Sequence, residues 1–235
     1  MYAINPNFRC QVRLVGIEKT PVIILDQVLT SLEPAINYAV SQAKFKSEQQ
    51  TYYPGMRATI DQAYQDLIVP FIHSIITEYF TVPQPHKIAL DAGYYSLICR
   101  AESMLKPEQC IPHFDSKTAN YFAITHYLNP GDFSGTAFYR HRQTQTETVT
   151  EQNVKLYFDS LNQYVANQGM LQQKYFSKSD EIFELIELVP YQANRMLIYP
   201  GALLHSAFVD DVSKNVIIDP KKGRLTANLF IELTN

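Results

Sequence analysis

The spacing of apolar residues divides the chain into a helical first third and a strand-rich remainder. Before residue 85, apolar side chains recur every three or four positions in two stretches, which predicts helices over about 32–43 and 67–80. Ahead of them, residues 11–25 have the composition of one or two strands. The first third is therefore expected to form a mixed α/β region.

After Pro85 the apolar positions follow a period of two, which is typical of strands. Turn-forming residues separate six such segments, which are Ile88–Arg100, Asn120–Leu128, Thr136–Arg140, Arg195–Tyr199, Leu203–Phe208 and Arg224–Leu233. Many short strands joined by turns predict a sandwich or a barrel. A polar stretch with helical spacing interrupts them and predicts a helical insertion over about 151–184. Its apolar side either packs on the sheet or closes over a pocket.

Composition narrows the class of protein. The 235 residues, 46% hydrophobic and 18% charged, suit one folded domain. The formal net charge is −3. Proteins that bind the phosphate backbone of nucleic acids usually carry an excess of basic residues, so no nucleic acid partner is expected. No apolar run is long enough to cross a bilayer, so no membrane partner is expected either. Three cysteines and no leader-like start favour a reducing compartment, and we expect a cytoplasmic protein.

The candidate chemistry begins with His113 and Asp115, which stand two positions apart. On a strand, residues two apart project from the same face, so this imidazole and this carboxylate could meet at one point. His205, on a predicted strand after a Pro-Gly turn, is the candidate third member. Two histidines and one carboxylate form the facial triad of non-haem Fe(II) oxygenases, whose open positions take a cosubstrate and O₂.

A polar row on the last predicted strand adds a second feature. Arg224, Thr226 and Asn228 alternate with apolar residues and therefore share one face of that strand. A guanidinium holds a carboxylate through two parallel hydrogen bonds, and the Thr226 hydroxyl could add a third. The pair Arg224 and Thr226 is thus a plausible anchor for a dicarboxylate such as 2-oxoglutarate.

The order of these residues along the chain resembles that of the 2-oxoglutarate/Fe(II)-dependent dioxygenase superfamily, in its prolyl-hydroxylase-like branch. The matching motifs are His113-x-Asp115, His205 and Arg224-x-Thr226. Residues 123–129 and 194–200 resemble neighbouring strands of that branch, and 134–142 resembles an uncharacterised bacterial oxygenase-like family. The resemblance covers about residues 90–235. It implies a single domain over 1–235 that is mainly β with flanking helices. Its core would be a double-stranded β-helix, or jelly roll, over 88–235, with an N-terminal α/β support region over 1–87 whose helices pack on it.

The resemblance also implies roles for individual residues. His113, Asp115 and His205 would hold Fe(II), and Arg224 with Thr226 would bind the distal carboxylate of 2-oxoglutarate. Tyr127 matches a tyrosine that assists that contact. The implied activity is an oxygenase that uses O₂ and the 2-oxo acid to hydroxylate a small molecule, an amino acid or a peptide side chain. Iron halogenases lack the carboxylate ligand, so Asp115 favours hydroxylation or a related oxidation.

Four features depart from the pattern or stay open. The 19-residue step from His205 to Arg224 exceeds the usual spacing, and Arg100 lies near the place of a tyrosine that often precedes the first histidine. Cys110 is interpreted as a bystander rather than a ligand or an oxidation target. The basic group 140–142 either contacts an acidic substrate or solvates a strand end.

Two other classes of protein compete with the oxygenase. The domain could be a cupin-like metalloenzyme that uses no 2-oxo acid. It could also be a non-catalytic protein that binds a metal and a small acid as a sensor, or that acts as a scaffold.

Overall fold

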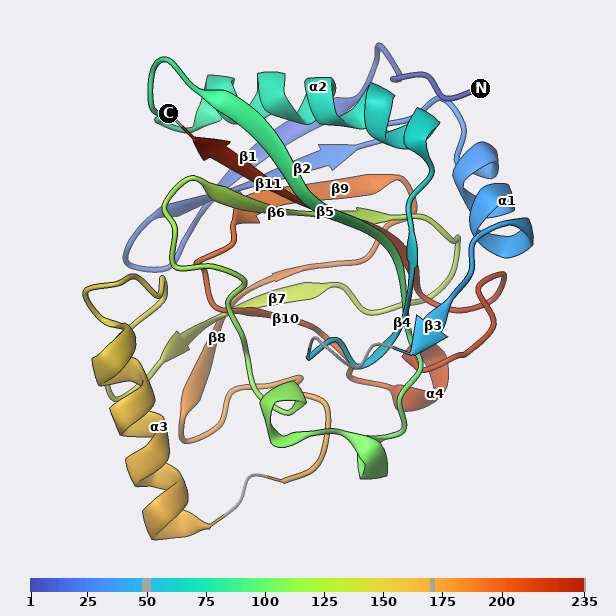
Figure 1. The fold of residues 1–235 in the computed structure, drawn as a ribbon. Helices are drawn as coiled ribbons and strands as arrows, with labels where there is room; N and C mark the ends of the chain where they lie inside the picture. Colours follow the sequence, from blue (N-terminus) through green and yellow to red (C-terminus); the bar gives the residue numbers. More distant parts are fainter. Residues whose placement is uncertain (48–51, 170–171, 235) are drawn as a thin grey trace.

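The computed structural model describes residues 1–47, 52–169 and 172–234. Two antiparallel sheets dominate it (Figure 1). The large sheet has the strand order β1-β2-β9-β6-β11-β5-β4-β3, and the small sheet has the order β10-β7-β8. The strands are β1 (Arg9–Val15), β2 (Thr20–Asp26), β3 (Lys46–Ser47), β4 (Gly55–Thr59), β5 (Lys87–Ile98), β6 (Tyr121–Tyr127), β7 (Thr136–His141), β8 (Phe183–Val189), β9 (Arg195–Pro200), β10 (His205–Ala207) and β11 (Leu225–Thr234).

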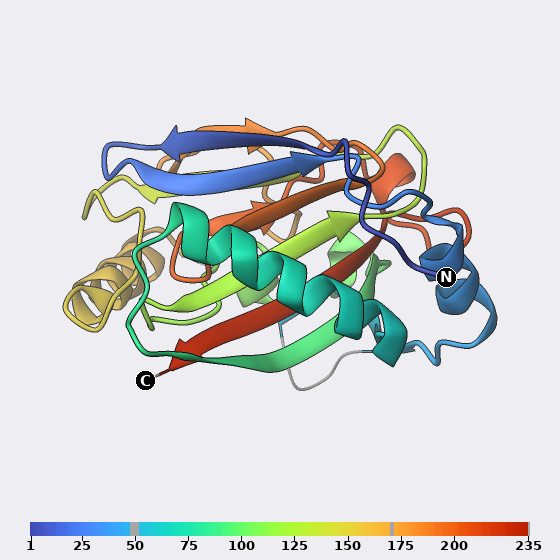
Figure 2. The same ribbon diagram turned by 90° about the horizontal axis from the view of Figure 1, so that it is seen from above.

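One face of the large sheet is covered by helix α2 (Gln62–Tyr79), which runs across it in Figures 1 and 2. The helix begins after Asp61, whose carboxylate accepts a hydrogen bond from the backbone N–H of Tyr64. Its apolar stripe, which includes Ile68, Ile72 and Ile76, is fully buried in the main core. This burial is what fixes the helix to the sheet, since helices gain most of their stability from packing an apolar face.

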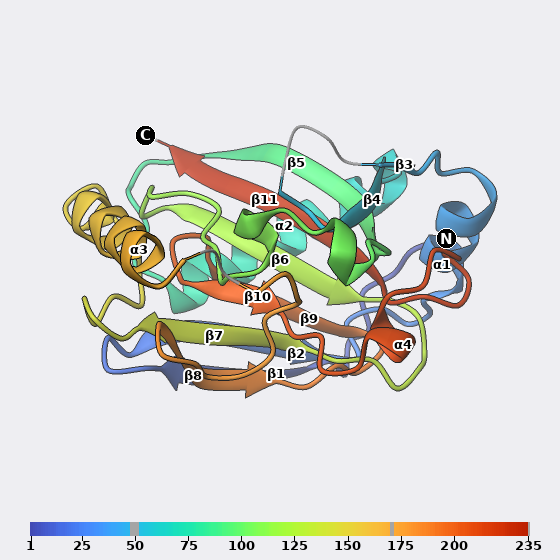
Figure 3. The same cartoon turned by 90° about the horizontal axis from the view of Figure 1, so that it is seen from below.

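The opposite face of the large sheet lies against the small sheet (Figures 1 and 3). A second core joins them, with Tyr127 and Leu197 from the large sheet packed together with Phe138 and Val189 from the small one. The architecture is therefore mainly β, with two facing antiparallel sheets and helices outside them. The space between the sheets is where the predicted site residues gather.

Three further helices lie in the described part of the chain. They are α1 (Glu33–Ser41) beside the N-terminus, α3 (Val154–Gln168) and the short α4 (Val212–Asn215), with 3₁₀ turns at Glu102–Met104 and Pro107–Gln109. Helix α3 packs its buried Tyr157 and Leu161 on a third cluster that includes Tyr139 and Leu204 of the small-sheet region. No helix in the described residues is both long and apolar enough to span a membrane.

The structure confirms both predicted helices, over 32–43 and 67–80, and all six predicted strands. Their ends are shifted by a few residues. The insertion was predicted too long, because α3 ends at Gln168 and β8 begins at Phe183, inside the expected 151–184. Residues 170–171 lie outside the described part of the chain. The strands β3, β4 and β8 were missed, since each is short or carries charged residues that weaken its apolar alternation.

The N-terminal third contributes strands as well as helices to the main sheet. Strand β2 pairs with β9, and β4 pairs with β5, so chain segments from before and after residue 87 form one continuous sheet. Four of the eight strands of that sheet come from the region expected to be a support. This arrangement places residues of β4 within reach of the same inter-sheet space as β11.

Candidate functional site

His113, Asp115 and His205 converge between the two sheets. One ligand atom from each lies within 4.8 Å of the others. Oδ2 of Asp115 is 3.4 Å from Nε2 of His205, and Oδ1 is 3.8 Å from Nε2 of His113. Ligand atoms on one transition-metal ion lie about 3 to 3.5 Å apart when the bonds are about 2.1 Å long and meet near a right angle. The three side chains thus converge on one point, with ligand atoms slightly farther apart than a bound ion would hold them.

Backbone pairing sets this geometry. His113 and His205 form an antiparallel bridge in which each N–H donates to the other's carbonyl, at 2.9 and 2.8 Å. The N–H of Asp115 donates to the carbonyl of Gly201 at 2.7 Å. The two residues do not share a strand, because His113 is a single bridge residue and Asp115 lies in a bend. His205 lies on a strand as predicted, and it is the first residue of β10 rather than an interior one.

The polar atoms of the cluster fit a cation. The ring Nδ1 of His205 lies 2.7 Å from the carbonyl of Leu203. A carbonyl only accepts, so Nδ1 carries the proton and Nε2 keeps a lone pair directed at the cluster. Oδ2 of Asp115 is buried and accepts no hydrogen bond from the residues that the structure describes. A divalent metal would satisfy this oxygen and both imidazole lone pairs, so the residues present fit such an ion.

The environment of the cluster shifts the pKa values of His113 and Asp115. About half of the His113 side chain is open to the cavity, but the surrounding wall still desolvates the ring. This desolvation, together with the charges of His205 and Arg57, lowers the pKa of His113 well below its usual value. Neutral imidazole is the form that binds metals. Burial raises the pKa of Asp115, which is the expected cost of a carboxylate held out of water without a cation.

The cluster forms part of the wall of a cavity of about 580 Å³. Aromatic side chains from several elements supply much of the remaining wall, among them Tyr121 of β6 and Tyr199 of β9. The insertion contributes as well, since Tyr157 and Phe158 of α3 line the cavity. The apolar side of the insertion therefore packs on the small sheet and also borders the pocket.

Arg224 and Thr226 line the same cavity. Arg224 is 3% exposed; its Nε donates to the carbonyl of Ser134 at 2.8 Å and its Nη2 to that of Gly135 at 3.0 Å. Thr226 is bonded through Oγ1 to Oδ1 of Asn228 at 2.6 Å. The polar row predicted for β11 thus faces the inter-sheet space, with its guanidinium held rigidly by backbone carbonyls.

Tyr127 lies beside Arg224 rather than on the cavity wall. It is absent from the cavity wall, and its hydroxyl lies 2.8 Å from Oγ1 of Thr136. Its ring centroid is 5.3 Å from the guanidinium carbon of Arg224, and that of Tyr191 is 5.8 Å away. Both rings lie within cation–π distance of the guanidinium and help to hold it in place. The contact of Tyr127 is therefore with Arg224 and Thr136 rather than with the space that a ligand would fill.

The basic group 140–142 and Cys110 lie outside the metal cluster. Arg140 donates from Nε to the buried Glu147 at 2.7 Å and from Nη1 to Glu184 at 3.0 Å, and Arg142 bonds a backbone carbonyl. The thiol of Cys110 donates to the carbonyl of Lys106 at 3.3 Å. These contacts are structural, and they agree with the bystander interpretation of Cys110.

Arg57 of β4 is the site residue that the sequence did not indicate. It lines the cavity, and its charge acts on both His113 and Asp115. Across the sheet its register partner is Ser96, which pairs in turn with Thr226. The signal that could have indicated this strand is the alternation of Arg57 and Thr59 around Ala58. A five-residue segment between two predicted helices is too short to be identified as a strand.

Comparisons with known proteins give distant structural similarity. The chain is similar to HygX from Streptomyces hygroscopicus in two crystal structures. Each alignment covers 92% of this chain and 84% of the HygX chain, at 10% sequence identity. One contains nickel, 2-oxoglutarate and hygromycin B and has a TM-score of 0.46; the other contains nickel and 2-oxoglutarate and has a TM-score of 0.45. No curated protein matches the chain.

A family comparison covers almost the whole chain. Residues 6–231 match the profile of DUF6445, which is described as a family of unknown function. The match spans all the strands of both sheets except the last residues of β11, and it includes every member of the cluster and the cavity wall described above. The chain belongs to the DUF6445 family.

Proposed function

We propose that this protein is a non-haem Fe(II), 2-oxoglutarate-dependent oxygenase that hydroxylates an organic substrate. The observation that carries the proposal is the convergence of His113, Asp115 and His205 on the wall of a cavity that also contains Arg224. Two imidazoles and one carboxylate leave the other coordination positions open, as an oxygenase centre requires.

The metal ligands would be His113, Asp115 and His205. A bound Fe(II) would supply the redox chemistry with O₂ and the 2-oxo acid. The chain itself fixes the directions of the ligand atoms. The Leu203 carbonyl holds the His205 ring, and the backbone bridge between the two histidines holds their spacing.

The distal carboxylate of 2-oxoglutarate would bind Arg224, with Thr226 beside it. Among the described residues, backbone carbonyls accept from two of the guanidinium's five N–H groups, which leaves donors for a carboxylate. Because the arginine is already immobilised by those bonds and by Tyr127 and Tyr191, it loses little freedom on binding. Its burial strengthens the attraction for an anion.

The two facing sheets agree with a jelly-roll core of the double-stranded β-helix type, which forms part of this proposal. In such a core the site lies between the sheets and the walls exclude water. Here the aromatic wall and the insertion residues Tyr157 and Phe158 would shield the reaction from solvent. The same wall would admit a small molecule, an amino acid or a peptide side chain as substrate.

The test is Fe(II)-dependent succinate formation from 2-oxoglutarate under O₂, with the metal-free protein as baseline. We expect succinate from the wild type and none above baseline from His113→Ala or His205→Ala. His73→Ala is the matched control, since His73 lies on α2 and bonds His86, outside the cavity. Slow uncoupled turnover is expected without the substrate, so the assay runs for many hours.

Binding measurements separate the competing classes. Under anaerobic conditions, Fe(II) with 2-oxoglutarate should give the visible charge-transfer band of a chelated 2-oxo acid. Metal binding without that band would support a cupin-like metalloenzyme. Absence of metal binding would overturn the oxygenase and favour a scaffold.

A further inference from the structure

Asn228 is the third member of the polar row that begins with Arg224 and Thr226. The three residues alternate along the chain at the start of β11, and all of them line the cavity of about 580 Å³ that contains the metal cluster. The proposed function uses the first two and leaves Asn228 without a role. Its side chain is only half-buried, so part of the amide faces the cavity.

Strand pairing sets the position of Asn228 along the cavity. Phe230, the next residue on the same face, pairs with Ala123 of β6, which pairs in turn with Tyr199 of β9. The ring centroid of Tyr199 is 4.8 Å from that of the proposed metal ligand His205. The guanidinium of the row lies at its opposite end. Asn228 therefore lies between the guanidinium and the part of the sheet beside the metal cluster.

A short hydrogen bond fixes the direction of the Asn228 amide. Oγ1 of Thr226 donates to Oδ1 of Asn228 at 2.6 Å. An amide oxygen can only accept, so the single hydroxyl proton of Thr226 lies in this bond. The carbonyl of Ser96 is a more distant acceptor for the same hydroxyl, at 3.5 Å. The Thr226 oxygen therefore presents lone pairs, rather than a donor, to an anion in the cavity.

The nitrogen of the same amide is the donor at this point of the row. Nδ2 and Oδ1 lie on different sides of the amide carbon, so Nδ2 points away from Thr226 when Oδ1 accepts from it. No acceptor for Nδ2 is found among the residues that the structure describes. An oxygen atom of a ligand in the cavity would satisfy its N–H groups.

The surroundings of Asn228 indicate an anionic ligand. Arg224, which is 3% exposed, supplies a buried positive charge at one end of the row, and the metal cluster lies at the other. The 2-oxo diacid that the proposed function assigns to this space has a carboxylate for each end, and its ionised oxygens only accept hydrogen bonds. An amide donor between the two ends matches such a molecule and would be left unsatisfied by an apolar one.

We infer that Asn228 binds the 2-oxo acid cosubstrate through Nδ2, and that Thr226 acts on the cosubstrate by holding this amide in place. The inference rests on the proposed function, because it concerns the same cosubstrate. Asn228 is then a cosubstrate-binding residue, whereas Thr226 is a positioning residue rather than a direct donor.

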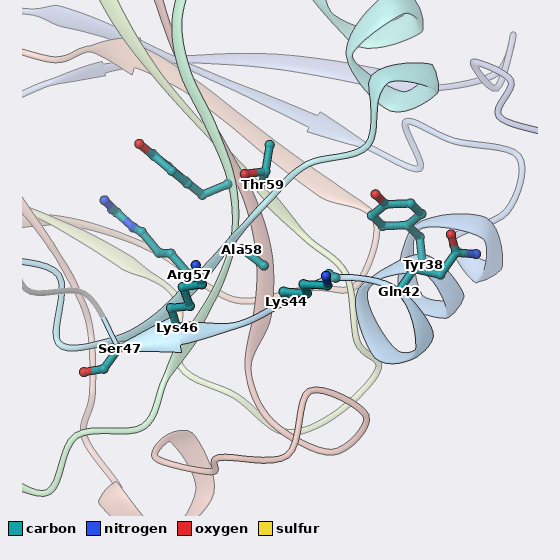
Figure 4. Close-up of a pocket in the computed structure, with 10 residues that line it drawn as sticks. Tyr38, Gln42, Lys44, Lys46, Ser47, Arg57, Ala58 and Thr59 are labelled. Atoms are coloured by element: carbon teal, nitrogen blue, oxygen red, sulfur yellow. The ribbon is translucent and has the colours of Figure 1, made fainter.

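A second hollow, of about 630 Å³, lies at the β3–β4 edge and is a competing place for a diacid (Figure 4). Lys44 and Lys46 line it, and both are labelled in Figure 4. The polar row of β11 is not part of its wall. Lys44→Gln therefore reports on anion binding outside the metal cavity.

The test measures the affinity for 2-oxoglutarate by calorimetry on protein loaded with Mn(II), which does not turn over. Asn228→Ala is expected to weaken binding about tenfold, because one hydrogen bond to a charged acceptor is lost. Asn228→Asp keeps the size of the side chain but places a negative charge at the donor position, so binding should weaken about a hundredfold or more. The affinity of Asn228→Ala for Mn(II) alone should equal that of the wild type, since Asn228 is not a metal ligand.

A double variant separates the two roles. If Thr226 acts through the amide, Thr226→Val combined with Asn228→Ala should bind 2-oxoglutarate about as weakly as Asn228→Ala alone. The control Asn162→Asp adds the same charge at an exposed position of α3, outside the cavity wall. Both Asn162→Asp and Lys44→Gln should bind 2-oxoglutarate like the wild type.

Four results would overturn the inference. Unchanged affinity in Asn228→Ala and Asn228→Asp, with affinity lost in Arg224→Gln, would remove Asn228 and leave the proposed function intact. Additive losses in Thr226→Val and Asn228→Ala would make Thr226 an independent donor. Loss of affinity in Lys44→Gln would assign the diacid to the β3–β4 hollow. A wild type that binds Mn(II) without binding 2-oxoglutarate would overturn the proposed function and the role of Asn228 together.

Discussion

His113 and His205 are bonded to each other through their backbones, each N–H donating to the other's carbonyl at 2.9 and 2.8 Å. Such a reciprocal pair is the hydrogen-bonded unit of an antiparallel ladder, and it fixes the two Cα atoms independently of the side chains. The spacing of the two imidazoles is therefore built by the fold. A metal would enter a preformed site, and replacement of either ring leaves the backbone bridge intact.

Asp115→Asn is expected to have opposite effects without and with metal. In the metal-free protein it replaces a carboxylate whose buried Oδ2 accepts no hydrogen bond within the described part of the chain, and an amide there can donate to Nε2 of His205. The free energy of unfolding should rise by about 1 kcal/mol. Urea denaturation in chelator measures this change. The rise in melting temperature that Mn(II) gives the wild type should disappear, and a variant less stable than the wild type in chelator would contradict the account.

Arg224→Gln should weaken 2-oxoglutarate binding by about a hundredfold, because a buried charge-assisted contact to a carboxylate is lost. It should also lower the free energy of unfolding by about 1 to 3 kcal/mol, since the carbonyls of Ser134 and Gly135 lose their donors. Calorimetry with the Mn(II) protein and urea denaturation measure the two effects. Thr226→Val is the milder companion, with about a tenfold loss of affinity expected. Unchanged 2-oxoglutarate affinity in Arg224→Gln would remove this arginine from the site.

Gly201→Ala should reduce metal affinity without touching a ligand. A Cβ at this position would lie 2.8 Å from a ring carbon of Tyr121 and 3.4 Å from Cβ of Asp115. The Gly201 carbonyl also accepts the N–H of Asp115, so a shift of this turn moves the carboxylate. We expect Mn(II) affinity to fall about tenfold and the free energy of unfolding by about 1 to 2 kcal/mol.

Gly93→Ala is the control for Gly201→Ala, because a Cβ there meets its nearest atoms at 3.8 Å, an ordinary contact. It should leave Mn(II) affinity at the wild-type value. Equal effects of the two substitutions would show that the turn at Gly201 does not position Asp115.

His126 should make the protein less stable as the pH falls from about 6.5 to 4. Its Nδ1 lies 2.7 Å from the Tyr64 hydroxyl and its Nε2 3.2 Å from Oδ1 of Asn194, which satisfies a neutral ring. Burial lowers the pKa of His126 from 6.5 to about 4. Between those values the unfolded chain takes up a proton and the folded chain does not, so the free energy of unfolding falls by about 3 kcal/mol across the window and levels off below it.

Urea denaturation at several pH values checks this slope. His126→Gln should flatten much of it, and the lowered pKa values of His113 and His141 account for a residual slope of the same sign. Equal slopes in the wild type and in His126→Gln would contradict a lowered pKa for His126.

The sequence alone determined the features that depend on local periodicity. The alternation in 88–128 and 195–233 predicted β5, β6, β9 and β11, because a pleated strand must place every second side chain in the core. The same alternation placed Arg224 and Thr226 on one face, which the cavity wall confirms. The order of His113, Asp115 and His205 predicted the cluster that the structure brings together.

Only the tertiary structure decided which distant groups meet. Arg57 reaches the cavity because β4 pairs with β5, a contact between segments whose local patterns carry no information about each other. Tyr127 supports Arg224 instead of lining the cavity, and Arg140 is held by Glu147, because buried charges must find partners wherever the fold provides them. Asp115 meets His205 through a bend rather than a strand, since a single backbone bond to Gly201 sets its direction. Local spacing limits which faces side chains share, whereas long-range strand pairing and the burial of charge select their actual neighbours.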